Sequence, residues 1–460
     1  MYKLDFNKPA KLHFTGIGGI SMSALAEIML SRHFIVTGSD SKESDITGHL
    51  ESLGAKVYIG QRASNVASDV DVLIYTAAVK QDNPELVAAT ELGIALLTRA
   101  EFLGQIMKNY STAIGVAGTH GKTTTTSMLS QIMLEADLDP TILVGGIMPT
   151  IGSNTRVGNS DKLITEACEY TNSFLSFAPT IGIILNVAED HLDFFKDIND
   201  IRNSFHEYAK LIPADGLLVI NGDIEKMDAI TNNLECNVIT VGENAESNDY
   251  SAANIEFDDF ARPSFDLLYN KEVIGHISLQ VTGIHNVYNS LAAIAAARFM
   301  GIDIDLISAG LNNCAGAERR FQFKGTLGNI TIIDDYAHHP DEIKATLTTA
   351  KRFPHKNTWC VFQPHTYTRT KALLNDFAEV LSKTDNVILA DIYAAREKNT
   401  LGISSEDLVK KINEKGGNAC YFPSFDEIEN FLLENCIDGD LVITMGAGDV
   451  YKIGEKLLGA

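Results

Sequence analysis

The sequence has no run of about 18 consecutive apolar residues, so none of its segments is predicted to span a membrane. It is also poor in positive charge, because 37 Lys and Arg stand against 60 Asp and Glu. A formal net charge of −23 argues against a nucleic-acid-binding surface. The six cysteines lie far apart, with no Cys-x-x-Cys pair. This spacing disfavours a disulfide framework and favours reduced thiols in a cytoplasmic protein.

What the sequence does contain is a strand, a glycine turn and a helix in succession around Gly118-Thr119-His120-Gly121-Lys122-Thr123-Thr124. Backbone N–H groups converge at such a turn, and the helix dipole favours negative charge there. Lys122 adds a mobile cation, and Thr123 adds a hydroxyl that can bind Mg²⁺. The pattern predicts a phosphate-binding loop, although Val116 stands where the usual P-loop has its first glycine. The alternative is a turn that only links a strand to a helix.

The N-terminal segment has a second glycine loop, Gly16-Ile17-Gly18-Gly19, between a strand and a helix. The next strand, at 34–37, ends at Gly38-Ser39-Asp40, which is the order of a dinucleotide-binding βαβ unit. Ser21 replaces the third glycine of that fingerprint, which disfavours a nicotinamide cofactor but still suits a diphosphate. Asp40 could bind a ribose hydroxyl, or it could be a solvated turn residue. Further strands are expected at 56–59, 70–75 and 94–97.

Acidic residues follow two buried strands in the middle of the chain. One strand leads to Glu166-Ala-Cys-Glu169, and the other leads to Glu189-Asp-His191-Leu-Asp193, while residues 152–158 are expected to form a polar loop. Parallel sheets place ligands at the carboxyl ends of their strands, and carboxylates there suit Mg²⁺ beside a polyphosphate. Glu166 and His191 are the candidate ligands, with helix capping as the alternative. Glu169, Asp190 and Asp193 are left undecided between the two interpretations.

A helix is expected from about 282 to 300, with the amides of Asn286 and Asn289 on one face of its first turn, either to position a ligand or to cap the helix. Four later strands, at 329–333, 358–362, 386–390 and 441–444, end in polar turns and predict another doubly wound sheet. Adjacent His338 and His339 lack the spacing of a zinc site.

Together these motifs resemble the Mur ligase family over nearly the whole chain. The resemblance rests on an ordered set that runs from His13-Phe-Thr-Gly-Ile-Gly-Gly19 to Gly446-Ala-Gly-Asp449 and includes Gly118–Thr124, Glu166–Glu169, Glu189–His191, His285–Asn289, Arg319-Arg-Phe321, Asp335–Pro340 and Phe362–Arg369. It implies an α/β protein of three domains. These are a Rossmann-like UDP-sugar-binding domain at 1–108, a central P-loop-type ATPase sheet at 109–314, and a Rossmann-like amino-acid-binding domain at 315–460.

The resemblance also implies an activity, namely ATP- and Mg²⁺-dependent joining of L-alanine to the lactyl carboxylate of UDP-N-acetylmuramate through an acyl phosphate, in peptidoglycan precursor synthesis. It places ATP on residues 118–124 together with His285 and Asn286, and Mg²⁺ on Thr123, Glu166 and His191. It implies catalytic roles for Lys122, Glu166, His191, Asn286, Asn289, Arg320 and Asp335. It assigns the substrates to Gly16, Gly18, Gly19, Ser39, Asp40, Tyr336, His338, His365 and Arg369.

The chain departs from the family pattern at two positions. Many members have an acid where this chain has Cys168, and a basic residue where it has Thr366. Three other functions stay open from the sequence: a family member that attaches a preformed peptide, a nicotinamide oxidoreductase, and a nucleotide-dependent switch. The sequence does not distinguish alanine from serine or glycine as the amino acid, nor does it indicate an oligomeric state.

Overall fold

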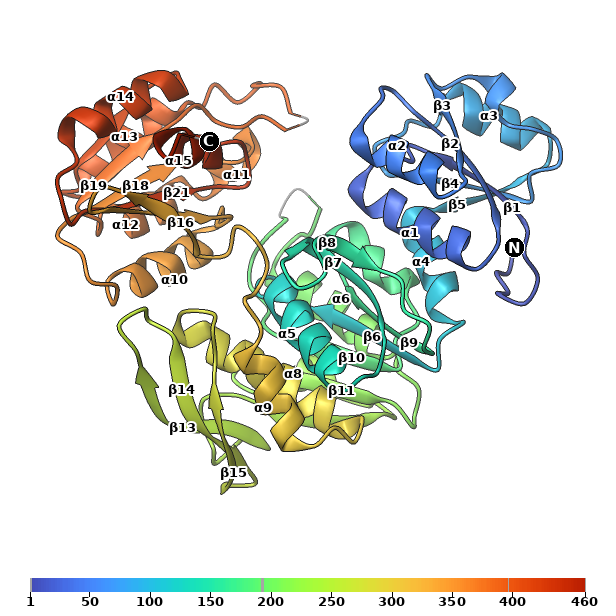
Figure 1. The fold of residues 1–460 in the computed structure, drawn as a ribbon, viewed down its shortest axis with the longest axis horizontal. Coiled ribbons are helices and arrows are strands. Elements are labelled where there is room, and N and C mark those ends of the chain that lie inside the picture. The colour runs from blue at the N-terminus through green and yellow to red at the C-terminus, as the bar shows by residue number, and fades with distance from the viewer. Residues whose placement is uncertain (1, 192–193, 396, 460) are drawn as a thin grey trace. The chain divides into compact units, whose positions relative to one another are not determined.

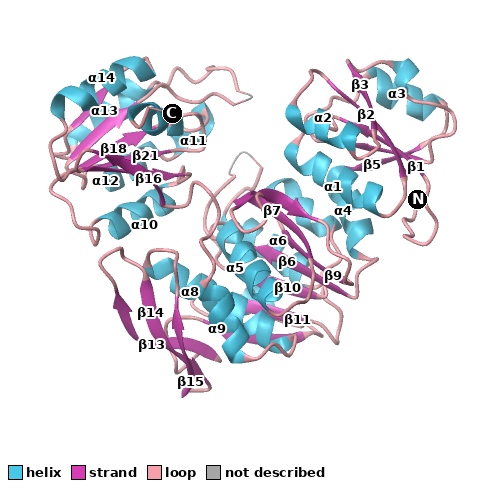
Figure 2. Cartoon of the chain, viewed as in Figure 1, coloured by secondary structure: helices cyan, strands magenta, loops and turns pink. Residues whose placement is uncertain are grey.

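The computed structural model describes residues 2–191, 194–395 and 397–459, in which helices alternate with the strands of three sheets (Figures 1 and 2). This confirms the predicted α/β class. The chain divides into two compact units. One comprises Met1–Ala252, Leu267–Gly275 and Asn289–Leu311, and the other comprises Ala253–Asp266, His276–Tyr288 and Asn312–Ala460. Within the described residues, no helix is long and apolar enough to cross a membrane.

The first sheet is parallel and has the strand order β3-β2-β1-β4-β5. Its strands are β1 (Lys11–Thr15), β2 (Ile35–Asp40), β3 (Lys56–Ile59), β4 (Val72–Tyr75) and β5 (Ala95–Thr98). Its helices are α1 (Ile20–Ser31), α2 (Asp45–Ser52), the short 3₁₀ turn η1 (Ala63–Asn65), α3 (Pro84–Glu91) and α4 (Arg99–Met107). The helix expected after the first glycine loop is α1, and it is buried at Met22, Leu25, Ala26 and Met29.

The second sheet has ten strands in the order β15-β14-β13-β12-β11-β10-β6-β9-β7-β8. They are β6 (Thr112–Ala117), β7 (Thr141–Met148), β8 (Ser153–Arg156), β9 (Lys162–Glu166), β10 (Ile181–Ile184), β11 (Leu217–Asn221), β12 (Asn237–Val241), β13 (Tyr250–Phe257), β14 (Pro263–Tyr269) and β15 (Glu272–Ser278). The helices of this region are α5 (Lys122–Glu135), η2 (Tyr170–Ser176), α6 (Ile198–Ala209), α7 (Asp228–Thr231), α8 (Ile284–Phe299) and α9 (Ile304–Asn312). Strand β6 lies in the middle, paired in parallel with both β9 and β10.

The polar loop expected at 152–158 is wrong in part, because Ser153–Arg156 form the edge strand β8. This strand pairs antiparallel with β7 across an irregular register. An edge strand of this kind needs no apolar alternation, because only one of its sides is paired. Composition therefore gave no signal for it.

The third sheet has the order β16-β17-β21-β18-β19-β20, in which only the β16 edge is antiparallel. Its strands are β16 (Gln322–Leu327), β17 (Ile330–Asp335), β18 (Thr358–Phe362), β19 (Asn386–Leu389), β20 (Ala419–Tyr421) and β21 (Leu441–Met445). Its helices are α10 (Pro340–Ala350), α11 (Tyr367–Ala372), α12 (Leu374–Leu381), α13 (Ser405–Glu414), α14 (Phe425–Asn435) and α15 (Tyr451–Leu457). The predicted doubly wound sheet is confirmed.

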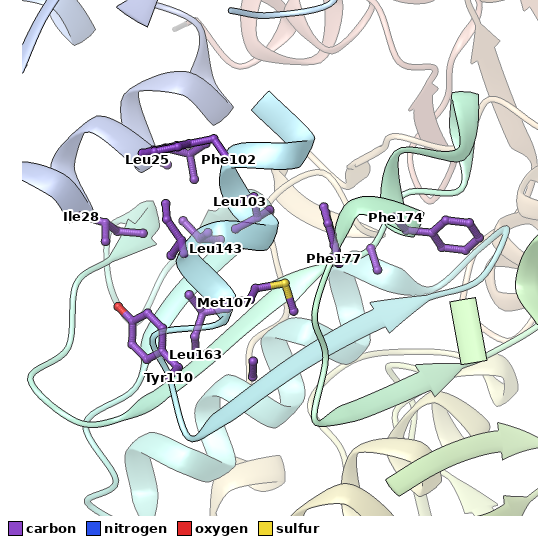
Figure 3. Packing of buried hydrophobic residues seen from close by; sticks show 14 of the residues in the cluster. Leu25, Ile28, Phe102, Leu103, Met107, Tyr110, Leu143, Leu163, Phe174 and Phe177 are labelled. Atoms are coloured by element: carbon purple, nitrogen blue, oxygen red, sulfur yellow. The ribbon is translucent and has the colours of Figure 1, made fainter. Parts of the chain in front are cut away.

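One apolar core joins the helices of the first sheet to the second sheet (Figure 3). It contains Leu25 of α1, Phe102 and Met107 of α4, Leu163 of β9 and Phe174 of η2. Helix α4 approaches η2 so closely that a Cβ at Gly104 would lie 1.8 Å from the carbonyl oxygen of Ser176. Residues 1–108 therefore share their core with the central segment, and the expected boundary at 108 stays a prediction.

Candidate active site

The predicted phosphate-binding loop joins the central strand β6 to helix α5, which begins at Lys122. Gly118 has a φ of +142° and Gly121 a φ of +84°, a backbone region that favours glycine. A Cβ at Gly121 would also lie 2.6 Å from the side-chain oxygen of Asn289. The turn has no room for a side chain at Gly121, because Asn289 of α8 lies next to it.

Asn186, two residues after the end of β10, forms hydrogen bonds with the phosphate-binding loop. Its Oδ1 accepts a hydrogen bond from the His120 N–H at 2.8 Å, its Nδ2 donates to the His120 carbonyl at 3.0 Å, and its own carbonyl accepts from the Thr119 N–H at 3.2 Å. The sequence interpretation missed this residue. Its position at the carboxyl end of a buried strand was the available signal.

Lys122 is almost buried, with 16% of its side chain exposed, and its ammonium group is held on several sides. It donates to the carbonyl oxygens of Gly118 and Thr119, and it forms an ion pair with Glu169 Oε2 at 3.0 Å. Burial lowers the pKa of Lys122, but Glu169 and neighbouring groups more than offset this, so the pKa lies above its usual value. The ammonium is charged and aimed at the loop.

Glu169, left undecided above, is therefore the direct partner of Lys122. Its side chain is 3% exposed. Next to it, burial and the Glu169 charge raise the pKa of Cys168, so this thiol is neutral. Where many family members carry a second acid, this chain has an uncharged group, and Glu169 is the carboxylate that binds Lys122.

The candidate metal ligands lie on the elements that surround the loop. Glu166 ends β9, in register with Val116 of β6, and accepts a hydrogen bond from the Gly145 N–H at 2.6 Å. Thr123 is in the first turn of α5 and is 7% exposed. The ring of His191 lies against that of Tyr170, with centroids 4.4 Å apart. Hydroxyl and carboxylate oxygens fit Mg²⁺, whereas an imidazole is a less typical ligand for it. Asp193 lies outside the described residues.

The N-terminal glycine loop is tied to the end of β2. Gly16 has a φ of +84°, and its N–H and that of Ile17 both donate to the Ser39 carbonyl, at 2.8 and 3.0 Å. The Gly18 N–H donates to Asp40 Oδ2 at 2.9 Å, and Gly19 caps α1. Asp40 thus contacts the loop directly, whereas the Ser39 side chain is fully buried.

The second unit brings four predicted substrate residues together at the carboxyl ends of β17 and β18. The rings of Tyr336 and His338 lie 5.6 Å apart, and those of His338 and His365 lie 5.7 Å apart. A guanidinium nitrogen of Arg369 is 3.1 Å from Nδ1 of His365. The result is a polar cluster that includes the cation of Arg369.

Asp335, the last residue of β17, is buried and accepts hydrogen bonds from the N–H groups of Phe321 and Ala337, at 2.8 and 2.7 Å. Burial raises the pKa of Asp335 to about 6, although the Arg320 charge opposes this. Arg320 lies over the Tyr336 ring, 5.4 Å from its centroid. Its neighbour Arg319, given no role above, binds Asp334 at 2.8 Å and the Gly446 carbonyl at 2.7 Å.

His285 lines a cavity of about 310 Å³ between the start of α8 and helix α10. Burial and the nearby Arg320 charge lower the pKa of His285 to about 4, so the ring is neutral near pH 7. Lys344 and Thr348 of α10, together with Arg352 after the end of that helix, also line this cavity. Asn286 is buried, and its amide donates to the Thr282 carbonyl at 2.8 Å. His285, Arg320 and Asp335 belong to the second unit, whereas Lys122 belongs to the first.

A largely parallel sheet whose central strand runs through a glycine turn into a helix, with a buried lysine and carboxylates at the strand ends, is typical of nucleotide-binding α/β proteins of the P-loop type. Three family models match the chain in succession. They are the Mur ligase family catalytic domain over residues 11–111, the Mur ligase middle domain over 116–297, and the Mur ligase glutamate ligase domain over 319–448. The chain belongs to the Mur ligase family and is a ligase.

Individual relatives agree with this assignment. A UDP-N-acetylmuramate–L-alanine ligase of Lachnospira eligens is 57% identical over 458 residues and 100% of both chains. The crystal structure of UDP-N-acetylmuramate–alanine ligase from Thermotoga maritima superposes with a TM-score of 0.80 at 28% identity, over 98% of each chain. A murein peptide ligase from Psychrobacter arcticus has a TM-score of 0.70 at 24% identity over 98% of each chain, which shows the shared fold alone.

Proposed function

We propose that the protein joins L-alanine to the lactyl carboxylate of UDP-N-acetylmuramate at the cost of ATP, and so makes a peptidoglycan precursor. The observation that carries this proposal is the charged, buried Lys122 at a glycine turn flanked by Glu166 and Glu169. Full-length similarity at 57% identity to a ligase named for these substrates supports it.

Carboxylates are poor acyl donors, so the lactyl group would first receive the γ-phosphoryl group of ATP. The amine of alanine would then form the C–N bond as the C–O bond to phosphate breaks, releasing inorganic phosphate and a proton. Lys122 would bind the β- and γ-phosphate oxygens and offset the charge that spreads over them during transfer. Bound at Thr123 and Glu166, Mg²⁺ would neutralise phosphate charge; His191 is its third candidate ligand.

The remaining roles follow the location of each cluster. His285 and Asn286 would contact the adenine, for which the neutral His285 ring and its cavity are suitable. Gly16, Gly18, Gly19, Ser39 and Asp40 would bind the uridine nucleotide. Tyr336, His338, His365 and Arg369 would bind the amino acid and muramyl group, with Arg369 facing a carboxylate. Arg320 and Asp335 would contact the nucleotide.

We place the domain boundaries at 1–108, 109–314 and 315–460, and we place the protein in the cytoplasm. All six cysteines are free thiols, which suits a reducing compartment. Within the family the rival function is attachment of a preformed peptide. The 57% identity over the full length to an alanine ligase favours the single amino acid.

The test is phosphate release with ATP, Mg²⁺ and UDP-N-acetylmuramate, measured with each of the twenty amino acids and with a tripeptide. We expect release that requires both acceptor and sugar nucleotide, with alanine the best acceptor. Release with the tripeptide alone would favour the rival function, and release without any acceptor would indicate a nucleotide switch.

A further inference from the structure

Glu85 is a fully buried carboxylate in the first turn of α3, outside every group assigned so far. Three side chains from other segments donate to it, each at 2.7 Å. The Thr15 and Ser39 hydroxyls bind Oε2, and the Asn65 amide binds Oε1. The His13 ring nitrogen Nε2 lies 3.3 Å from Oε2. These donors hold the pKa of Glu85 at about 2 despite its burial, so the group is an anion.

Oε2 of Glu85 is connected to the glycine loop by hydrogen bonds through Ser39. Ser39 is paired with Thr15 of β1 and Tyr58 of β3, and its side-chain bond to Glu85 holds it from a third direction near the end of β2. The Ser39 carbonyl accepts the N–H groups of Gly16 and Ile17 at 2.8 and 3.0 Å. The Glu85–Ser39 bond therefore contributes to the orientation of two loop peptides.

Oε1 of Glu85 is connected to the same loop by hydrogen bonds through Asn65. Besides Glu85, the amide of Asn65 donates to the Gly60 carbonyl at 2.9 Å, and the Gly60 N–H donates to the Asp40 carbonyl at 2.7 Å. Asp40 in turn accepts the Gly18 N–H at 2.9 Å. Both paths from Glu85 end on the peptides of residues 16–18.

We propose that Glu85 is a positioning residue for the site that binds the uridine diphosphate part of the sugar nucleotide. It acts through Ser39 and Asn65 to hold the loop N–H groups and Asp40 in the arrangement that the ligand meets. This inference rests on the proposed function, because it needs a uridine nucleotide at Gly16–Gly19. An apolar side chain at position 85 would fill the same space at a lower desolvation cost. Because both hydrogen-bond paths from the buried Glu85 anion end at the glycine loop, we infer that the anion serves binding at that loop.

The test compares Glu85→Gln with Asn109→Ala. The glutamine has the shape of the glutamate but no charge, and its NH₂ group must face either the Asn65 amide, where two N–H groups oppose each other, or the two hydroxyls, which must then turn from donors into acceptors. Asn109 lies in the same part of the chain and binds Phe6, Leu4 and Gln105 without touching the glycine loop. It therefore controls for a general loss of stability.

For Glu85→Gln we expect the KM for UDP-N-acetylmuramate and the Kd for UDP to rise at least tenfold. The KM for ATP and the kcat at saturating sugar nucleotide should stay within twofold. Asn109→Ala should lower the melting temperature and leave every KM unchanged. An unchanged KM in Glu85→Gln, or a uniform change in all kinetic constants, overturns the proposal.

Should Glu85→Gln fail to fold, Asn65→Ala removes only the path through Asn65, and a rise of about threefold in the same KM is expected. No rise there also overturns the proposal. The proposed function has a separate outcome. If the wild-type protein binds neither UDP nor UDP-N-acetylmuramate, that function is wrong, and the role of Glu85 is wrong with it.

Discussion

At the scale of residues, the main cation of the phosphate-binding loop, Lys122, is already paired with a carboxylate of the protein. The Lys122 ammonium lies 3.0 Å from Glu169 and also binds two loop carbonyls. Such a pair is preorganised, because the ammonium needs to move little to reach a phosphate at the start of α5. The neutral Cys168 beside it leaves a single acid in contact with the lysine.

Lys122→Ala should reduce amino-acid-dependent phosphate release by about 10³-fold, because the charge on the transferred group loses its protein cation. The measurement is steady-state release at saturating substrates. Lys162→Ala is the matched control, since this lysine of β9 pairs with its exposed neighbour Asp161. A Lys122→Ala protein that ligates near the wild-type rate would contradict the assigned role.

The raised pKa of Asp335 predicts a dependence of stability on pH. The folded protein keeps this proton up to about pH 6, whereas an unfolded Asp loses it near 3.8. The folded state thus binds more protons in that window, so this carboxyl contributes less stability as the pH rises, by about 3 kcal/mol in all. The difference in melting temperature between Asp335→Asn and the wild type should therefore shift in favour of the variant from pH 4.5 to pH 7. An equal difference at both pH values would show that the pKa is not raised.

At the scale of elements, strands and helices with strong periodicity could be predicted from the sequence, whereas contacts between separate segments could not. The helix after Gly19, the helix around 284–299 and the parallel strands of the third sheet were all predicted from the sequence pattern. Strand β8 did not, because its pairing with β7 comes from tertiary contact and not from composition. The same reason hid Asn186, whose role depends on a loop 66 residues away. Glu169 was visible as a candidate, but its contact with Lys122 needs three dimensions.

Two helical glycines give a matched stability test. A Cβ at Gly104 of α4 would lie 1.8 Å from the Ser176 carbonyl, whereas a Cβ at Gly48 of α2 would meet nothing within 4 Å. Gly104→Ala should lower the unfolding free energy by about 2 kcal/mol or more, since backbone must shift. Gly48→Ala should raise it by about 0.5–1 kcal/mol through helix propensity. Thermal denaturation measures both, and equal effects would refute the close approach of α4 to η2.

At the scale of the molecule, the shared core of the first and second sheets makes residues 1–108 dependent on the central segment (Figure 3). Phe102 and Met107 of α4 have their apolar neighbours partly in β9 and η2. Separating the segments would expose this surface to water. The three matched family segments therefore need not correspond to three independently stable bodies.

Native-state hydrogen exchange tests this dependence. The amides of β1 and β6 should open with the same free energy and the same denaturant dependence, because one core covers both strands. The comparison needs only the wild-type chain, with β21 of the third sheet as an internal reference in the other unit. Opening of β1 at clearly lower denaturant than β6 would show that the N-terminal sheet is independently unstable.

The ion pair at the phosphate loop also has a consequence for selectivity. An incoming anion competes with a resident carboxylate and two carbonyl dipoles for the same three protons on Nζ. A weak competitor, such as a single inorganic phosphate, gains little by the exchange, whereas a chelated triphosphate brings enough charge to displace the occupant. We therefore expect the loop to favour ligands of high charge density and the product phosphate to be a poor inhibitor.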